Sequence, residues 1–122
     1  YKRQGVDTTN LHANENFIDI AVGNYTSCAL TSEANVYCWG EGSSGEIGDN
    51  SGATNHSPTQ VDQTNMATGE KFVSLAVGGN HACGTTGAGS VYCWGADGEG
   101  EIGNGATTGS QNRPVIIDET NL

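Results

Sequence analysis

The chain has 122 residues, of which 34% are hydrophobic and 19 are glycine, and its formal net charge is -10. This length fits one ordinary domain, but the apolar fraction is low for a chain with a large core. The negative charge opposes contact with phosphate backbones, and no apolar run is long enough to cross a bilayer. Neither nucleic acid nor membrane insertion is therefore expected.

The glycine content and the lack of apolar residues at helical spacing predict an all-β fold. Glycine-rich turns separate short runs of alternating or β-branched residues, and the chain contains only 2 prolines. Such a pattern is typical of short strands joined by turns.

The first element in chain order is a short motif that occurs three times. The segment "VDTTNL" at residues 6–11 returns as "VDQTNM" at 61–66 and as "IDETNL" at 117–122. We therefore expect residues 1–11 to be the leading strand of a preceding repeat, followed by repeat 1 (12–66) and repeat 2 (67–122).

The two repeats match each other position by position. Residues of repeat 1 recur 55 positions further on, as Phe17 does at Phe72. A period in this range is typical of propeller blades or solenoid units. The recurring residues are Phe17, Ala21, Val22, Gly23, Cys28, Tyr37, Cys38, Trp39, Gly40, Glu46, Ile47 and Gly48.

Each repeat begins with an apolar strand, "FIDIAV" at 17–22 and "FVSLAV" at 72–77. Strict alternation places Ile18, Ile20 and Val22 on one face, opposite Phe17. Because the strand is apolar on nearly both faces, we expect it to be sandwiched between neighbouring structural elements.

A hairpin, an acidic glycine loop and a last strand complete each repeat. The hairpin of repeat 1 turns near Glu33 and that of repeat 2 near Ala88, and the last strands are "TQVD" and "PVIID". This predicts two four-stranded antiparallel propeller-type blades. Arrays of this kind generally need three or more repeats, so the pair is expected to be incomplete on its own.

The sequence of repeat 2, with "GNHAC", "GSVYCWGADGEGEIGNG" and "RPVIID", resembles the regulator-of-chromosome-condensation repeat. This resemblance implies four-stranded blades that usually close as a seven-bladed ring, with loops that bind a protein partner. Three departures stand out: Thr26 replaces the histidine found at His81, Thr85 replaces Leu30, and Glu-Ile replaces the more usual Gln-Leu.

Two cysteine pairs flank the predicted hairpin turns. Cys28 faces Cys38, and Cys83 faces Cys93, across adjacent antiparallel strands. Directly opposed cysteines reach disulfide distance, and each bond would stabilise its repeat by about 3 kcal/mol. Disulfides predict an extracellular, secreted or cell-surface protein. Free thiols remain an alternative, and a zinc site is disfavoured by the spacing within each pair.

Three further patterns are typical of binding or modification sites. Asn24 and Asn55 begin N-x-Ser/Thr triplets and are candidate glycosylation acceptors. Two segments, 40–45 and 98–103, match G-x-G-x-x-G, but their acidic residues would repel a pyrophosphate. In the second acidic loop, Asp97, Glu99 and Glu101 form a weak calcium-site candidate. The alternative interpretation of this loop is a solvated turn.

The tryptophans are interpreted as packing residues rather than as sugar-stacking platforms. His81 is interpreted as structural, because its counterpart is Thr26. No cofactor and no enzymatic activity are expected. The residues expected to pack within and between the blades are Phe17, Trp39, Phe72, Trp94, Ile47 and Ile102.

The function predicted from these features is a non-enzymatic extracellular assembly module. Its partners would be other copies of itself, or adjacent repeats of a longer chain, meeting head to tail in a filament or a larger array. Two alternatives stay open: a fragment of a closed propeller that binds a protein partner through its loops, and a carbohydrate-binding propeller. The last would need exposed aromatic residues, for which the candidates are Tyr1, Tyr25, Phe17 and Phe72.

Overall fold

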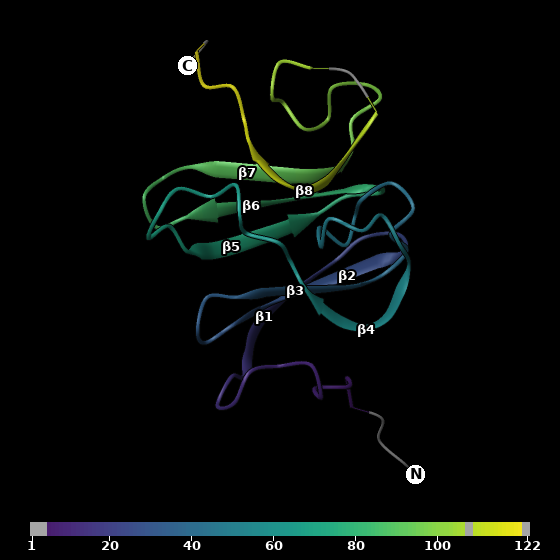
Figure 1. Ribbon diagram of the computed structural model, residues 1–122, viewed down its shortest axis with the longest axis vertical. Coiled ribbons are helices and arrows are strands. Elements are labelled where there is room, and N and C mark those ends of the chain that lie inside the picture. The colour runs from purple at the N-terminus through teal and green to yellow at the C-terminus, as the bar shows by residue number, and fades with distance from the viewer. Residues whose placement is uncertain (1–4, 107–108, 121–122) are drawn as a thin grey trace.

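The structure, a computed structural model, describes residues 5–106 and 109–120 (Figure 1). These residues form two four-stranded antiparallel sheets and contain no helix, hence none that could span a membrane. The sheets follow the strand orders β1-β2-β3-β4 and β5-β6-β7-β8. The all-β class and the two four-stranded blades are thus confirmed.

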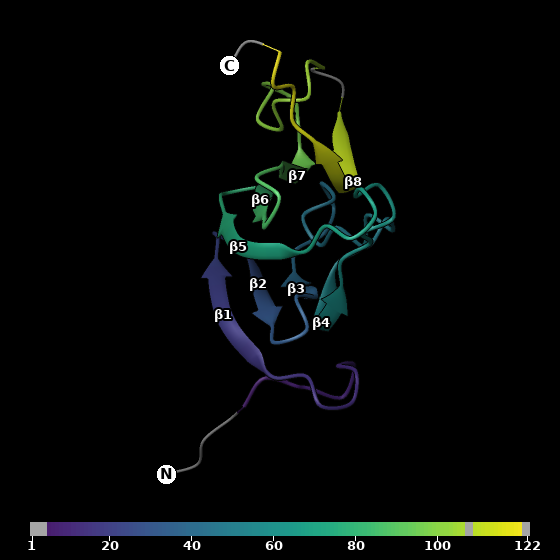
Figure 2. The same cartoon turned by 90° about the vertical axis from the view of Figure 1, so that its left-hand side faces the viewer.

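Each sheet comes from one repeat. Blade 1 contains β1 (Phe17–Val22), β2 (Thr26–Thr31), β3 (Val36–Gly40) and β4 (Asn55–Gln60). Blade 2 contains β5 (Phe72–Val77), β6 (His81–Thr86), β7 (Val91–Ala96) and β8 (Ser110–Ile116). Figure 2 shows the two blades stacked along the long axis of the molecule, with β5 lying across the end of blade 1.

A bulge near the start of β1 and of β5 changes the faces expected from strict alternation. In β1, Phe17 pairs with Thr31 and Asp19 already pairs with Leu30, so one extra residue is absorbed between them. The same shift occurs between Phe72 and Ser74. As a result Phe17 lies on the same face as Ile20, and the expectation that they lie on opposite faces was wrong.

The leading segment also differs from the expected strand. Residues 5–11 form no strand, and Thr9 and Asn10 lie in a turn. The backbone N–H of Thr9 donates to Asp7 Oδ1 at 3.0 Å, as that of Thr64 does to Asp62. An Asp side chain that holds the backbone two residues on favours a turn over an extended strand. In repeat 1 the motif follows β4 and leads the chain to blade 2, and residues 117–120 follow β8 in the same way.

The main core lies between the blades. Blade 1 contributes residues of β2 and β3, and blade 2 contributes the opposing residues of β5, β6 and β7. Each sheet thereby buries one face against its neighbour, as stacked repeats do. The buried residues of this cluster are Cys28, Leu30, Val36, Cys38, Ile47, Val61, Phe72, Ala82, Tyr92 and Trp94.

Candidate functional site

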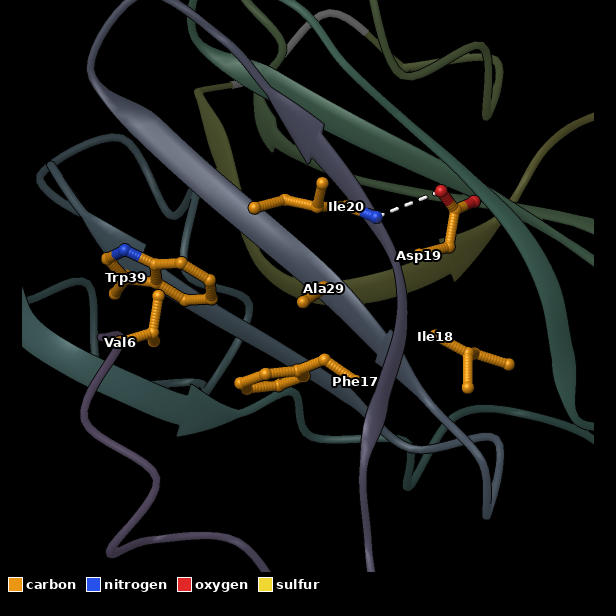
Figure 3. A pocket seen from close by; sticks show the side chains of 7 residues that line it. All are labelled: Val6, Phe17, Ile18, Asp19, Ile20, Ala29 and Trp39. Atoms are coloured by element: carbon orange, nitrogen blue, oxygen red, sulfur yellow. Dashed lines mark hydrogen bonds between the residues drawn. The ribbon is translucent and has the colours of Figure 1, made fainter. Parts of the chain in front are cut away.

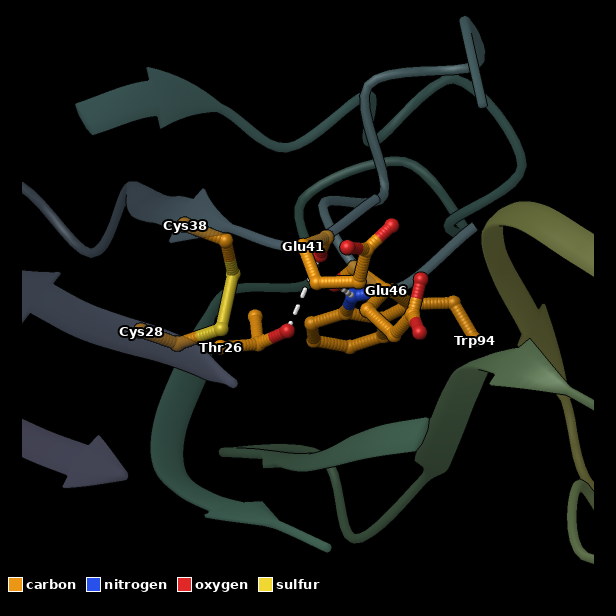
Figure 4. Close-up of a disulfide and its surroundings, with 6 residues drawn as sticks. All are labelled: Thr26, Cys28, Cys38, Glu41, Glu46 and Trp94. Carbon is orange, nitrogen blue, oxygen red and sulfur yellow. Dashed lines mark hydrogen bonds between the residues drawn. A yellow bond between two sulfur atoms is a disulfide. The ribbon is translucent and has the colours of Figure 1, made fainter. Parts of the chain in front are cut away.

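The contact that joins the blades pairs the Trp of one repeat with the acidic glycine loop of the other. The Trp94 side chain in β7 is fully buried, and its Nε1–H donates to the backbone oxygen of Glu46 at 2.9 Å. Figure 4 shows the indole lying against the 41–48 segment that follows β3. We call this Trp–loop contact the joint.

Glycine is required in the loop because the indole approaches the backbone closely. A Cβ atom on Gly48 would lie 2.7 Å from Trp94 Nε1, and Gly48 has a φ of +74°. Only glycine adopts this conformation without strain and leaves the space free. Further along the loop, the N–H of Asn50 donates to the oxygen of Asn112 at 2.7 Å, which ties the loop to β8.

The Glu-Ile pair of the loop serves the same joint. The Glu46 carboxylate is buried and accepts the N–H of Ser44 at 2.9 Å, while Ile47 enters the core between the blades. In repeat 2, Glu101 accepts the N–H of Glu99 at 2.9 Å. Backbone hydrogen bonds hold the pKa of Glu101 below its usual range. In both repeats the glutamate of the Glu-Ile-Gly sequence therefore accepts a backbone hydrogen bond from its own loop, which stabilises the loop conformation.

The turn between repeats adds a second contact to the outer strand of the next blade. Asn65 Nδ2 donates to the oxygen of Pro114 at 3.4 Å, and Asp62 pairs with Arg113 at 3.3 Å. The leading segment repeats this arrangement, because Asn10 Nδ2 donates to the oxygen of Pro58 at 3.0 Å. Residues 5–11 thus attach to blade 1 as residues 61–65 attach to blade 2.

Blade 1 leaves one half of a joint uncovered. Trp39 corresponds to Trp94 but is only half-buried, and Ile20 and Val22 are 57% and 65% exposed. Trp39 and Ile20 border a hollow of about 420 Å³ that Val6 and Phe17 also line (Figure 3). We define the first open face as Phe17, Ile20, Val22 and Trp39.

Blade 2 leaves the other half uncovered, on its opposite side. Its residues correspond to those of blade 1 that pack against blade 2, but Thr85 stands where blade 1 has Leu30. Thr85 is exposed and shares a hydrogen bond with Ser74. We define the second open face as Ser74, Ala76, Cys83 and Thr85.

Both cysteine pairs form cross-strand disulfides. Cys28 is bonded to Cys38 and Cys83 to Cys93, and each pair is directly opposed in its sheet with a Cα–Cα distance of 4.1 Å. Their surroundings differ. Cys28 and Cys38 lie in the core between the blades, whereas Cys83 is half-buried on the second open face.

A repeated carboxylate and tyrosine network stands beside each sheet, and the sequence reading missed it. Glu15 is buried and accepts hydrogen bonds from Thr31 at 2.9 Å, Tyr37 at 2.8 Å and Asn35. Burial raises the pKa of Glu15, but the hydrogen bonds outweigh it and hold that pKa below its usual range. Burial and the adjacent Glu15 raise the pKa of Tyr37 to about 12. The recurrence of Glu15 at Glu70, in step with the tyrosines, is the signal that identifies this network.

The acidic residues of the second loop do not assemble into a metal site. Asp97 Oδ1 accepts the N–H of Ile102 at 3.2 Å, and Glu101 is engaged by the loop backbone. Within residues 5–106 and 109–120, no group of three His, Cys, Asp or Glu side chains is placed to hold a metal ion. The G-x-G-x-x-G segments open no helix in the described residues, as a dinucleotide site would need.

The other predicted site residues are dispersed over the two blades. Asn24 is exposed at the turn after β1, and Asn55 lies in β4 with its amide on Asp49 Oδ2 at 3.3 Å. Phe72 is buried between the blades, so it is unavailable to a sugar, whereas Tyr25 is 75% exposed. His81 is half-buried at the start of β6. Tyr1 lies outside the described residues.

Two family models, both described as the regulator of chromosome condensation (RCC1) repeat, match this chain. One covers residues 17–46 and 72–101, and the other covers residues 33–84. Together they run without a gap from residue 17 to residue 101, across both blades. The chain belongs to the RCC1-repeat family. The Trp–loop joint therefore lies in the part of the chain that carries the family match.

Relatives of known sequence are much longer than this chain. It is 34% identical over 88 residues to the X-linked retinitis pigmentosa GTPase regulator homolog of Caenorhabditis elegans, covering 72% of this chain and 6% of that protein. It is 34% identical over 100 residues to the human E3 ubiquitin-protein ligase HERC2, covering 82% of this chain and 2% of that protein. The matched RCC1-type segment is thus a small part of each relative.

Solved structures show the same arrangement of blades. Human WBSCR16 aligns with a TM-score of 0.78 at 20% identity, over 88% of this chain and 27% of that chain. Prp20p of Saccharomyces cerevisiae, whose binding to Gsp1p and histones has been described, aligns with a TM-score of 0.75 at 25% identity, over 90% of this chain and 27% of that chain. The two blades correspond to about a quarter of these RCC1-type propellers.

Proposed function

We propose that the chain is a non-enzymatic protein-binding module whose primary ligand is another RCC1-type blade. The observation that carries this proposal is the joint itself. Its donor half, Trp94, and its acceptor half, Glu46 and Gly48, meet inside the chain. The counterparts of both halves, Trp39 on one side and Gly103 on the other, face outward. Each open face is therefore shaped to receive a further blade.

Energetic reasoning supports the same proposal. In repeat arrays, stability is approximately a sum of repeat terms and nearest-neighbour interface terms. Two blades have one such interface, and their exposed Ile20 and Val22 remain in water. Covering apolar surface stabilises an array by about 25 cal/mol per Å². Additional blades would therefore strengthen the module.

The proposal is tested with a four-blade tandem. Two copies are joined so that residues 117–122 of the first lead directly into residue 12 onward of the second. We expect the tandem to unfold at a higher denaturant concentration than the 122-residue chain, because a second joint forms at the junction. Equal midpoints for the tandem and the chain would refute the proposal.

A substitution at the junction provides the matched control. Trp39→Ala in the second copy should return the tandem to the stability of the unjoined chain. The same substitution in the unjoined chain measures its local cost. If Trp39→Ala destabilises both proteins equally, the junction contains no joint.

We further propose an extracellular or cell-surface location and a binding role towards protein partners. The two disulfides support the location, because such bonds persist in oxidising compartments. The similarity to Prp20p, a protein described as binding Gsp1p and histones, supports a protein-binding role. Thiol alkylation of protein taken from its native source tests the location. Cysteines that are free before any reduction would contradict it.

A further inference from the structure

We propose that separate copies of this chain associate head to tail, with the second open face of one copy on the first open face of the next. This rests on the proposed function and extends it from blades within one polypeptide to blades of different copies. The intermolecular contact repeats the joint seen within the chain. Trp39 of one copy donates its indole N–H to the backbone oxygen of Glu101 in the other.

The interface inside the chain shows which residues would become covered. Phe72 and Trp94 are buried there, and their counterparts Phe17 and Trp39 are half-buried at the first open face. Leu75 and Val77 pack on the inter-blade core, and their counterparts are the exposed Ile20 and Val22. The first open face therefore presents apolar groups in the register that the covered face uses.

The acceptor half of the joint is present in the loop of repeat 2, at Gly103. Gly103 has a φ of +72°, close to the +74° of Gly48. A Cβ atom on Gly103 would meet only Ile117, at 3.8 Å, whereas one on Gly48 would collide with the indole of Trp94. At Gly103 the loop of repeat 2 thus has the backbone conformation of Gly48, with the place of the indole left open.

Ile18 of β1 is the residue that we expect to stay exposed when two copies associate. Ile18 lies in the bulge, also lines the hollow of Figure 3, and is 63% exposed. Its counterpart Val73 remains 57% exposed although blade 1 covers the rest of that face of blade 2. Ile18 should therefore stay in water when two copies associate, while Ile20, two residues further on, becomes covered.

Two features make the contact between copies weaker than the contact inside the chain. Thr85 stands where blade 1 has Leu30, so the second open face presents a smaller side chain with an exposed hydroxyl at this position. Val6 also occupies the place that Ile117 of the other copy would take, because both correspond to Val61. Residues around Val6 must shift when the copies join. The association is accordingly expected to depend on concentration.

Sedimentation velocity of the full, non-reduced chain over a range of concentrations tests the proposal. We expect the weight-average mass to rise with concentration. Ile20→Glu should weaken the association at least about a hundredfold, since it buries a charge. Ile18→Glu, with the same change of charge on the same strand, should leave it unchanged. Ile18 and Ile20 are both exposed in the isolated chain, so neither substitution should disturb the core. Thermal unfolding of each variant verifies its fold.

Thr85→Leu tests the other face by a gain of affinity. Restoring the leucine of blade 1 should strengthen the association about tenfold, corresponding to about 1.4 kcal/mol. A mass that stays monomeric at all concentrations, or equal effects of Ile18→Glu and Ile20→Glu, would overturn the proposal. A stabilised tandem combined with a monomeric chain would overturn this inference alone and leave the proposed function standing.

Discussion

Trp39 and Trp94 occupy the same position in their blades, but only Trp94 has a neighbour to bind. Its indole N–H donates to the oxygen of Glu46 and its ring is fully buried, whereas Trp39 is half-buried and lines an open hollow. Trp94 therefore shows the joint with a loop bound to the indole, and Trp39 shows the same position without one.

The first prediction compares alanine substitutions of these residues. Trp94→Ala should lower the free energy of unfolding by about 3 to 5 kcal/mol, as is usual for a large buried aromatic side chain. Trp39→Ala should cost less than half of that, because its ring is partly in water. Chemical denaturation monitored by circular dichroism measures both values at a concentration where the chain is monomeric. Equal costs would contradict the assignment of the joint.

A second prediction uses the paired glycines Gly48 and Gly103. Both have φ values near +70°, so alanine strains the backbone to a similar degree at each. Only at Gly48 does the added methyl group collide with an indole. Gly48→Ala should therefore destabilise the chain by about 1 to 3 kcal/mol more than Gly103→Ala. Thermal unfolding of the two variants side by side gives the difference, and identical midpoints would count against the close approach.

The sequence predicts a large part of this fold because the repeat compares the chain with itself. The strands, the hairpin turns and the opposed cysteines follow from local alternation and from residues that recur together. Each of these features depends on neighbours within one sheet. The face of Ile20 was predicted incorrectly, because a bulge at Ile18 shifts the alternation and leaves no mark in the apolar pattern.

The joint lay beyond sequence reasoning for a different reason. Trp94 and Glu46 are 48 residues apart and belong to different repeats, Trp94 to β7 and Glu46 to the loop after β3, so no spacing within a strand links them. The acidic loop also suggested calcium, because alternating carboxylates are a common ligand pattern. In the structure, Glu46 and Glu101 instead accept backbone N–H groups of their own loops. Hydrogen bonds of this kind depend on loop conformation, which composition does not specify.

The third prediction concerns the order in which the disulfides are reduced. Cys28 and Cys38 are covered by blade 2, whereas Cys83 is half-buried on the second open face. Limited reduction followed by alkylation and mass spectrometry should label Cys83 and Cys93 first. Full reduction should then lower the free energy of unfolding by about 3 kcal/mol for each bond.

Two results would contradict this prediction. Labelling of Cys28 and Cys38 before the other pair would mean that blade 2 does not cover them. An unchanged melting temperature after full reduction would mean that the disulfides do not stabilise the blades. Head-to-tail association adds a further expectation, since it should protect Cys83 more strongly at high protein concentration.

The fourth prediction concerns acid stability. Hydrogen bonds hold the pKa of Glu15 below its ordinary value of 4.5 in the folded chain. Its ionised form therefore stabilises the fold above about pH 4.5, and this contribution is lost as the pH falls through the folded pKa. Glu15→Gln should make stability less dependent on pH in this acidic range.

Urea denaturation at a series of pH values between neutral and acid measures that dependence. Glu33→Gln, in the exposed turn between β2 and β3, corrects for the loss of one negative charge. If Glu15→Gln and Glu33→Gln give the same pH dependence, the network of Glu15 and Tyr37 does not contribute to acid stability.

The joint is tested most directly by hydrogen exchange at the two indole N–H groups, followed by NMR and assigned with Trp39→Phe. In a dilute, monomeric sample we predict that the Trp94 indole hydrogen exchanges slowly, since it is buried and bonded to Glu46. The Trp39 indole hydrogen should exchange rapidly. Rapid exchange at both indoles, or protection of Trp39 alone, would contradict the account of how these blades are joined.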